Sequence, residues 1–313
     1  MRISLLIISL IFIFISCEDP QRDVEILWDQ YGIPHIYAQN PDDLFYAYGW
    51  AQAHAHGDLL LRLYGQARGR GAEYWGENFL NSDKWMWTNG VPARAKQWAD
   101  EQINPSKSML ESYIVGVNDY AAKHPENISD DFEVVLPITM EDLMAHALRV
   151  LQYTFVISPD DLQEDAKSWS DQKGSNAWAV SPSRSVSGHA MLVANPHLYW
   201  GDLFTWFEVH LNLPDANIYG ASLVGSPALG IMFNEHLGWT HTVNTHDGAD
   251  LYELTLADGG YDYDGVVKPF AVDSIELHIK EGDSSRTEIC VVKRFKNGPV
   301  VKRTEKHALA LRV

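Results

Sequence analysis

Gly174–Ser175, a pair in the middle of the chain, has the residue types needed for a nucleophile that carries its own base. If the peptide bond before Ser175 is cut, the serine gains a free α-amine beside its hydroxyl. An α-amine titrates near ~8, and a general base works best when its pKa lies near the working pH. Glycine suits the position before the cut because it lets the backbone bend sharply. Taken alone, Gly-Ser-Asn is equally typical of a loop that leads into a strand.

Several longer motifs stand in order around this serine. They are residues 31–38 (YGIPHIYA), 48–53 (YGWAQA), 195–198 (NPHL), 238–244 (GWTHTVN) and 247–252 (DGADLY). From about Val24 onward the sequence resembles the penicillin acylase family of N-terminal-nucleophile hydrolases. Its Asn-Pro-His-Leu segment is more similar to the acyl-homoserine-lactone and lipopeptide acylases than to penicillin G acylase. Several motifs in order are far more specific than any one of them.

The resemblance implies acyl transfer at Ser175. The hydroxyl attacks an amide carbonyl, an acyl-enzyme forms, the amine leaves, and water releases the acid. By position, Val243 matches the family residue whose backbone N–H faces the oxyanion, and His197 matches the residue beside the nucleophile. The family's second oxyanion donor, an asparagine much later in the chain, cannot be assigned here, and Asn244 does not align with it. Trp178 is expected to pack beneath its strand.

An acidic segment after Val243 carries the family's metal positions. Asp247, the Ala249 carbonyl and Asp250 match residues that bind a structural calcium in penicillin acylases, and closely spaced oxygens suit a hard cation. A carboxylate from the first half normally completes that site, and Asp161 or Glu164 could serve. The alternative is a solvated acidic loop in a chain whose formal net charge is −18.

Aromatic residues are expected to line the acyl pocket. Trp200, Phe204 and Trp206 follow His197, and Phe155 would reach the pocket from the helical half. Large buried cores use the same residue types. The alternative for each of them is therefore packing in the core.

The start of the chain predicts export. Arg2 precedes a short apolar run over 3–15, and a membrane span needs about 20 apolar residues. The run ends at Cys17, in a pattern that resembles a lipoprotein cleavage box, so Cys17 is the predicted lipid anchor; a plain secretory signal is the alternative. Either way we expect a periplasmic protein or an outer-membrane-anchored lipoprotein. Only Cys290 remains, so disulfides are not expected to contribute to stability.

Local signals predict a helical first half. A helix is expected over 41–64, with Asn40 as its cap and proline in its first turn. A second is expected over 107–123. A third begins at Thr139, where Asp142 approximates the partner residue of a capping box.

The second half is β-rich. Strand-like runs recur about every ten residues, at 190–194, 207–213, 218–223, 230–233, 239–243 and 251–256. The fold class is therefore α+β, and the family resemblance implies an αββα sandwich, here incomplete. Residues 1–17 are the predicted leader, 18–157 an α-chain-like region, 158–174 a linker or spacer, and 175–313 a β-chain-like core. The chain stops inside a strand-like run, so a truncated sequence is expected.

The predicted function is an amidohydrolase for an N-acylated small molecule: an acyl-homoserine lactone, a lipopeptide or a penicillin-type amide. The α and β fragments are expected to stay associated. A nucleic-acid partner is not expected because the chain has no basic run. A metal-dependent hydrolase is one alternative, although neither His54/His56 nor His241/His246 has a strong zinc spacing. A non-catalytic surface lipoprotein that binds carbohydrate or peptide, or an inactive fragment, is the other.

Overall fold

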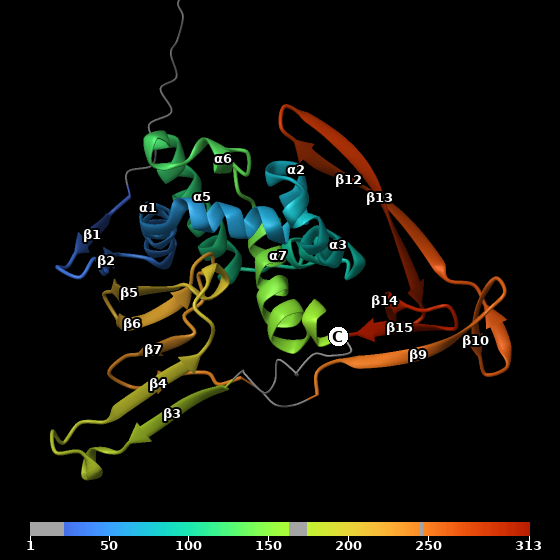
Figure 1. The fold of residues 1–313 in the computed structure, drawn as a ribbon. Coiled ribbons are helices and arrows are strands. Elements are labelled where there is room, and N and C mark those ends of the chain that lie inside the picture. Colours follow the sequence, from blue (N-terminus) through green and yellow to red (C-terminus); the bar gives the residue numbers. More distant parts are fainter. Residues whose placement is uncertain (1–21, 163–173, 244–246) are drawn as a thin grey trace, which may run out of the picture.

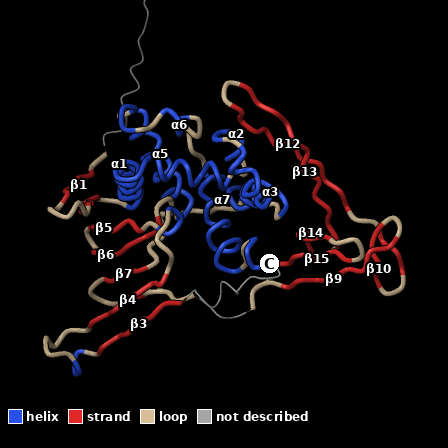
Figure 2. The backbone as a smooth tube through the Cα atoms, in the orientation of Figure 1, coloured by secondary structure: helices blue, strands red, loops and turns tan. Residues whose placement is uncertain are grey.

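The structure, a computed structural model, describes residues 22–162, 174–243 and 247–313. Helices dominate its first half and strands its second half, which confirms the α+β class (Figures 1 and 2). The predicted anchor Cys17, the calcium candidate Glu164 and most of the predicted spacer lie outside these ranges. The proposed division into leader, α-chain and β-chain therefore stays a prediction. None of the helices within the described ranges combines the length and apolar character of a membrane span.

The helices form one central layer, with strands on both sides of it in Figure 1. They are α1 (Pro41–Ala67), α2 (Gly71–Trp75), α3 (Leu80–Thr88), α4 (Val91–Asp100), α5 (Ser106–Lys123), α6 (Asp130–Glu133) and α7 (Met140–Val150), which continues as a π-helical turn (Leu151–Val156). Single 3-10 turns lie at Glu77–Phe79, Pro125–Asn127, Pro159–Leu162, Pro182–Arg184 and Asp202–Phe204.

The start of α1 follows its local signals. The Asn40 side chain accepts a hydrogen bond from the Asp43 backbone N–H at 2.9 Å, and Pro41 occupies the first turn. The helix runs past the predicted end and bends at His56, whose φ of −143° and ψ of 32° are not helical. The cap and the start were predictable because they depend on neighbouring residues only.

Close approach of α1 and α5 depends on two glycines. A Cβ on Gly49 would collide with the backbone oxygen of Tyr113, and one on Gly116 would collide with that of Tyr46. The backbones of the two helices are therefore in direct contact. A larger side chain at either glycine would push α5 away from α1.

A buried ion pair fixes where α7 begins. Arg68, just after α1, donates to both carboxylate oxygens of Asp142, at 2.5 and 2.8 Å, and to the Val135 carbonyl at 2.7 Å. Asp142 also accepts from the backbone N–H of Thr139 at 2.7 Å, so the predicted capping-box pair is present. One carboxylate thus joins the start of α7 to the end of α1.

The first large sheet has six strands, in the order β1 (Val24–Trp28), β2 (Pro34–Ala38), β5 (Trp206–Leu213), β6 (Ala216–Leu223), β7 (Ile231–Phe233) and β8 (Gly238–Trp239). Strands β2 and β5 are parallel, with His35 opposite His210. Phe207, Val209 and Leu211 alternate along β5 and are buried in the same core as the helices. One face of this sheet is therefore covered by the helices.

The second large sheet lies along the other side of the helices (Figure 1). Its seven strands run in the order β11 (Val266–Lys268), β10 (Gly260–Tyr263), β9 (Asp250–Ala257), β15 (His307–Arg312), β14 (Gly298–Arg303), β13 (Ser284–Phe295) and β12 (Ala271–Glu281). The long β12–β13 hairpin packs Leu277 and Ile279 against Ala72 of α2 and Leu80 of α3. Cys290 is a buried free thiol in this cluster.

A separate hairpin carries the predicted nucleophile. It consists of β3 (Gly174–Val180) and β4 (Met191–His197), with Ser175 opposite Pro196. Trp178 is 56% exposed, so the prediction that it packs beneath the strand is wrong. Sequence alone could not show this, because the exposure of a strand face depends on which element covers it.

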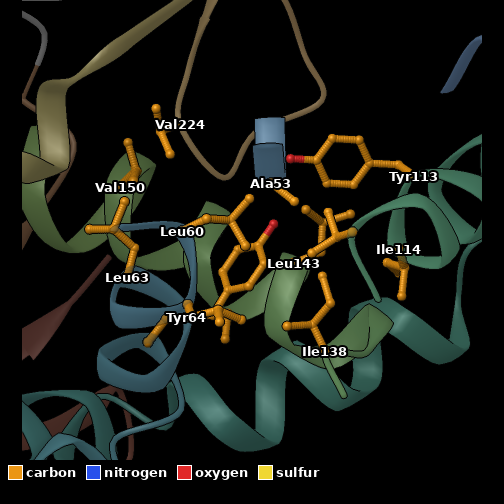
Figure 3. Close-up of a cluster of buried hydrophobic side chains, with 14 of the residues drawn as sticks. Ala53, Leu60, Leu63, Tyr64, Tyr113, Ile114, Ile138, Leu143, Val150 and Val224 are labelled. Carbon is orange, nitrogen blue, oxygen red and sulfur yellow. The ribbon is translucent and has the colours of Figure 1, made fainter. Parts of the chain in front are cut away.

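The core nearest the site lies between α1, α5 and α7. Figure 3 shows Leu60, Leu63 and Tyr64 of α1 gathered with Leu143 and Val150 of α7. All five are almost completely buried. This packing holds α7 against α1, and α7 in turn forms one wall of the cavity described next.

Candidate active site

A cavity of about 940 Å³ lies beside Ser175. Its wall combines α7 and the following π-helical turn with the turn after β6 and the segment before β9. Much of that wall is apolar, including Leu110, Leu143, Met144, Val150, Val156, Ile157, Leu198 and Leu251. The volume lies within the usual range for a small-molecule pocket, about 300–1,000 Å³. The cavity can therefore hold an apolar group next to the candidate nucleophile.

The Ser175 hydroxyl lies against the peptide group that precedes it. Its Oγ donates a hydrogen bond to the Gly174 carbonyl oxygen at 2.6 Å. His197 pairs with Gly174 across the hairpin, and a Cβ on Gly174 would lie 3.6 Å from His197 Nδ1. His197 Nε2 is 3.0 Å from the Asn195 side-chain nitrogen. The structure thus brings His197 beside the Gly174–Ser175 bond.

The predicted oxyanion residue lies at the same cavity. Val243 and Thr242 line it together with Ser175. The preceding His241 Nδ1 lies 2.8 Å from the Gly230 carbonyl, which requires a proton on that nitrogen. These residues come from segments far apart in the sequence and meet at one wall. The role of the Val243 N–H stays a prediction.

The four aromatic residues predicted for the acyl pocket separate into three groups. Phe155 and Trp206 line the cavity. Phe204 is buried and does not line the cavity, and its ring centroid lies 5.3 Å from that of Phe155. Trp200 is fully exposed at 102% and is not part of the cavity wall. The structure therefore does not bring Trp200 to the site.

One part of the cavity wall was not predicted from the sequence. The turn from Gly225 to Gly230 lines the cavity along its whole length. In the sequence it consists of glycine, serine, proline, alanine and leucine, which predicts only a turn between two strands. No local signal separates a turn that lines a cavity from one at the surface.

A sequence profile described as penicillin amidase matches residues 23–313. The chain belongs to the penicillin amidase family. The family resemblance inferred from the ordered motifs is thereby confirmed.

Curated relatives of this penicillin amidase family member are acylases. The acyl-homoserine lactone acylase PvdQ of Pseudomonas putida is 29% identical over 304 residues, which cover 85% of this chain and 39% of that protein. PvdQ of Pseudomonas savastanoi pv. phaseolicola is 27% identical, over 92% of this chain and 42% of that protein. Aculeacin-A acylase of Actinoplanes utahensis is 31% identical over 118 residues, which cover 36% of this chain and 15% of that protein. The chain thus spans about two fifths of the length of the PvdQ proteins.

Among solved structures, thermostable penicillin G acylase from Alcaligenes faecalis resembles this chain with a TM-score of 0.37. Its sequence is 21% identical, and the match covers 42% of this chain and 73% of that chain.

The residues predicted to bind calcium are only partly brought together. Asp161, Asp247 and Ala249 line the same cavity. Asp161, however, accepts hydrogen bonds from the Ser158 backbone and hydroxyl at 2.7 and 2.8 Å, and Asp250 faces Arg312 at 4.0 Å. In the described part of the chain, no three histidine, cysteine or acidic side chains cluster as metal ligands. The residues therefore do not form a ready-made site, and calcium stays a prediction.

A histidine in the cavity wall is held neutral. His146 of α7 is 2% exposed, and neither ring nitrogen has a hydrogen-bond partner among the described residues. Burial lowers the pKa of His146 to about 3, the Arg149 charge acts in the same direction, and the nearby Val224 backbone opposes them. The buried imidazole is therefore neutral and keeps a single ring proton.

The low pKa of His146 predicts an acid-sensitive contribution to stability. In the unfolded chain the pKa of His146 is about 6.5, so below that pH the unfolded chain binds a proton at this histidine while the folded chain does not. The free energy of unfolding therefore decreases as pH falls, until pH approaches 3. We expect the difference in unfolding free energy between wild type and His146→Leu to change by about 1.4 kcal/mol per pH unit in this window. Denaturant titrations at several pH values measure it. Parallel curves for the two proteins would contradict the assignment.

Proposed function

We propose that this protein is an amidohydrolase that cuts its own chain between Gly174 and Ser175. Ser175 then acts as an N-terminal nucleophile on the amide of an N-acylated small molecule. The observation that carries the proposal is the 2.6 Å contact between Ser175 Oγ and the Gly174 carbonyl oxygen, at the wall of an apolar cavity. The proposed nucleophile Ser175, the proposed scissile bond before it and an apolar cavity thus lie side by side.

In the proposed self-cleavage step, Ser175 Oγ acts on the peptide group whose carbonyl oxygen it already contacts. Ser175 Oγ attacks the Gly174 carbonyl carbon, the C–N bond breaks, and the hydroxyl proton passes to the departing nitrogen. Water then hydrolyses the resulting ester and returns a proton to Oγ. The products are a carboxylate on Gly174 and a free α-amine on Ser175. That amine can act as the base for the same hydroxyl in later turnovers.

Acyl transfer would follow at the same hydroxyl. We propose that the acyl group enters the cavity, that the Val243 N–H stabilises the oxyanion, and that His197 supports the nucleophile. A single preorganised donor of this kind contributes about 2.7–4 kcal/mol to transition-state stabilisation in another serine hydrolase. No described residue of this chain is assigned to a second donor.

The apolar wall favours an aliphatic or aromatic acyl group over a charged one. Relatives named as acyl-homoserine lactone and aculeacin-A acylases support the same class of substrate. Export, anchoring at Cys17, association of the α and β fragments and a structural calcium stay proposals that follow from the sequence.

Hydrolysis assays separate this function from its alternatives. We expect the complete gene product to release free homoserine lactone from an acyl-homoserine lactone, and brief EDTA treatment of the folded enzyme to leave that rate unchanged. The mechanism uses no metal at the reacting atoms, which is the physical reason for this expectation. Loss of turnover with EDTA would favour the metal-dependent hydrolase. Saturable binding without hydrolysis would favour the binding lipoprotein.

A further inference from the structure

The turn that lines the cavity, residues 225–230, depends on side chains from α1 for its shape. Gly225 has a φ of +84°, a conformation that other residues rarely adopt. The ends of the turn bond to strand β6, since Ser226 N donates to Leu223 O and Gly230 N donates to Ala221 O, both at 2.9 Å. The N–H of Gly225 and the carbonyls of Gly225 and Ser226 are bonded instead by side chains of α1.

Gln52 is the centre of these contacts. Its side-chain oxygen accepts from the Gly225 N–H at 3.0 Å and from the Tyr113 hydroxyl at 2.9 Å. Its nitrogen donates to the Ser226 carbonyl at 3.0 Å and to Ser222 Oγ at 3.3 Å. Gln52 is fully buried. A glutamine amide offers two acceptor and two donor sites, and here all four are used.

The orientation of this amide is determined by its partners. The Gly225 N–H can only donate and the Ser226 carbonyl can only accept, so the Gln52 oxygen and nitrogen cannot exchange places. Tyr64, also on α1, donates to the Gly225 carbonyl at 2.8 Å. Two side chains of one helix therefore fix the turn through its backbone.

The far end of the turn reaches the segment that contains Val243. Trp239 Nε1 donates to the Leu229 carbonyl at 3.2 Å, and His241 Nδ1 to the Gly230 carbonyl at 2.8 Å. A displacement of the turn would therefore alter the cavity wall and the approach to the reacting atoms together.

We propose that Gln52 is a positioning residue that sets which acyl-chain lengths the cavity accepts. This inference rests on the proposed function. A buried amide is costly unless it is fully hydrogen-bonded, whereas a saturated buried network favours one arrangement of its parts. An apolar residue could fill the same space but would leave the Gly225 N–H and the Ser226 carbonyl without their partners, so this part of the turn would be less firmly fixed. A hydrophobic pocket discriminates a single methylene by about 10–200-fold, so a small displacement of this wall changes chain-length preference.

The test compares three variants with wild type. Gln52→Met keeps a similar unbranched shape and removes all four hydrogen bonds. Tyr64→Phe removes the contact to the Gly225 carbonyl from the other side. Tyr113→Phe is the matched control, because it removes a bond to the same Gln52 oxygen without touching the turn. For each protein, kcat/KM is measured on acyl-homoserine lactones of graded chain length, and binding of the corresponding free fatty acids is measured by calorimetry.

We expect Gln52→Met and Tyr64→Phe to change the ratio of kcat/KM between long and short chains by about tenfold or more, with a matching change in fatty-acid binding. Tyr113→Phe should keep the wild-type ratio. An unchanged ratio in Gln52→Met, or an equal change in Tyr113→Phe, would overturn the positioning role.

The two readouts also separate this inference from the proposed function. One outcome is a protein that hydrolyses no amide but binds fatty acids, with a chain-length preference that changes in Gln52→Met. That outcome would support the positioning role and reject the hydrolase. A wild-type protein that neither binds nor hydrolyses would reject both.

Discussion

Replacing Ser175 by alanine is expected to leave the Gly174–Ser175 bond intact and to reduce amide hydrolysis by about four orders of magnitude or more. The Ser175 hydroxyl is the only group of the protein that attacks a carbonyl carbon in the proposed account; water attacks only the ester that Ser175 has formed. It serves both the chain cut and the acyl transfer, so its loss removes both steps at once. Gel electrophoresis measures the cut, and release of the free amine measures the hydrolysis.

Two variants make this result specific. Ser175→Cys keeps a nucleophile at the same position and should be cut at a measurable rate. Ser181→Ala changes an exposed serine in the same region, near the end of β3, and should behave as wild type. If Ser175→Ala is still cut at the same bond, the hydroxyl is not the attacking group.

Asp142→Ala is expected to lower the free energy of unfolding by about 3–5 kcal/mol. The Asp142 side chain is 4% exposed and that of Arg68 is 18% exposed, so the variant leaves a largely buried guanidinium without its counter-ion. The same change removes the cap of α7 at Thr139. Because α7 carries Leu143 and Met144 of the cavity wall, ligand binding should weaken as well. Denaturant unfolding monitored by circular dichroism measures the change.

An exposed pair provides the comparison for Asp142. Lys96 and Asp100 lie 3.0 Å apart on α4, with side chains 61% and 67% exposed, and solvent screens such pairs strongly. Asp100→Ala should therefore change stability far less than Asp142→Ala. Replacing both buried partners, as Arg68→Met with Asp142→Leu, should restore much of the loss because no uncompensated charge remains. Equal effects of Asp142→Ala and Asp100→Ala would show that the buried pair does not anchor α7.

Elements with local signals were predicted well from the sequence. The Asn40 cap, the start of α1 and the Thr139–Asp142 pair depend on residues within one helical turn, and the observed strands largely overlap the runs predicted between 190 and 256. The ordered motifs led to the penicillin amidase family, because such motifs are identified by residue type and spacing. The role they assign to Ser175 stays a prediction.

Features that depend on distant contacts were not predictable in the same way. The parallel pairing of His35 with His210 joins positions 175 residues apart, and no periodicity encodes it. Trp200 was expected in the pocket because it follows His197, but it lies in the bend after β4, and its exposure depends on which element covers that bend. Gln52 lies within the YGWAQA motif, but its contacts with the turn appear only when α1 lies against Gly225.

The mass of the intact polypeptides in an active preparation tests the central claim most directly. The account predicts two chains, one of which begins with Ser-Asn-Ala-Trp at Ser175. A preparation that hydrolyses N-acyl amides while every molecule retains the Gly174–Ser175 bond would contradict it.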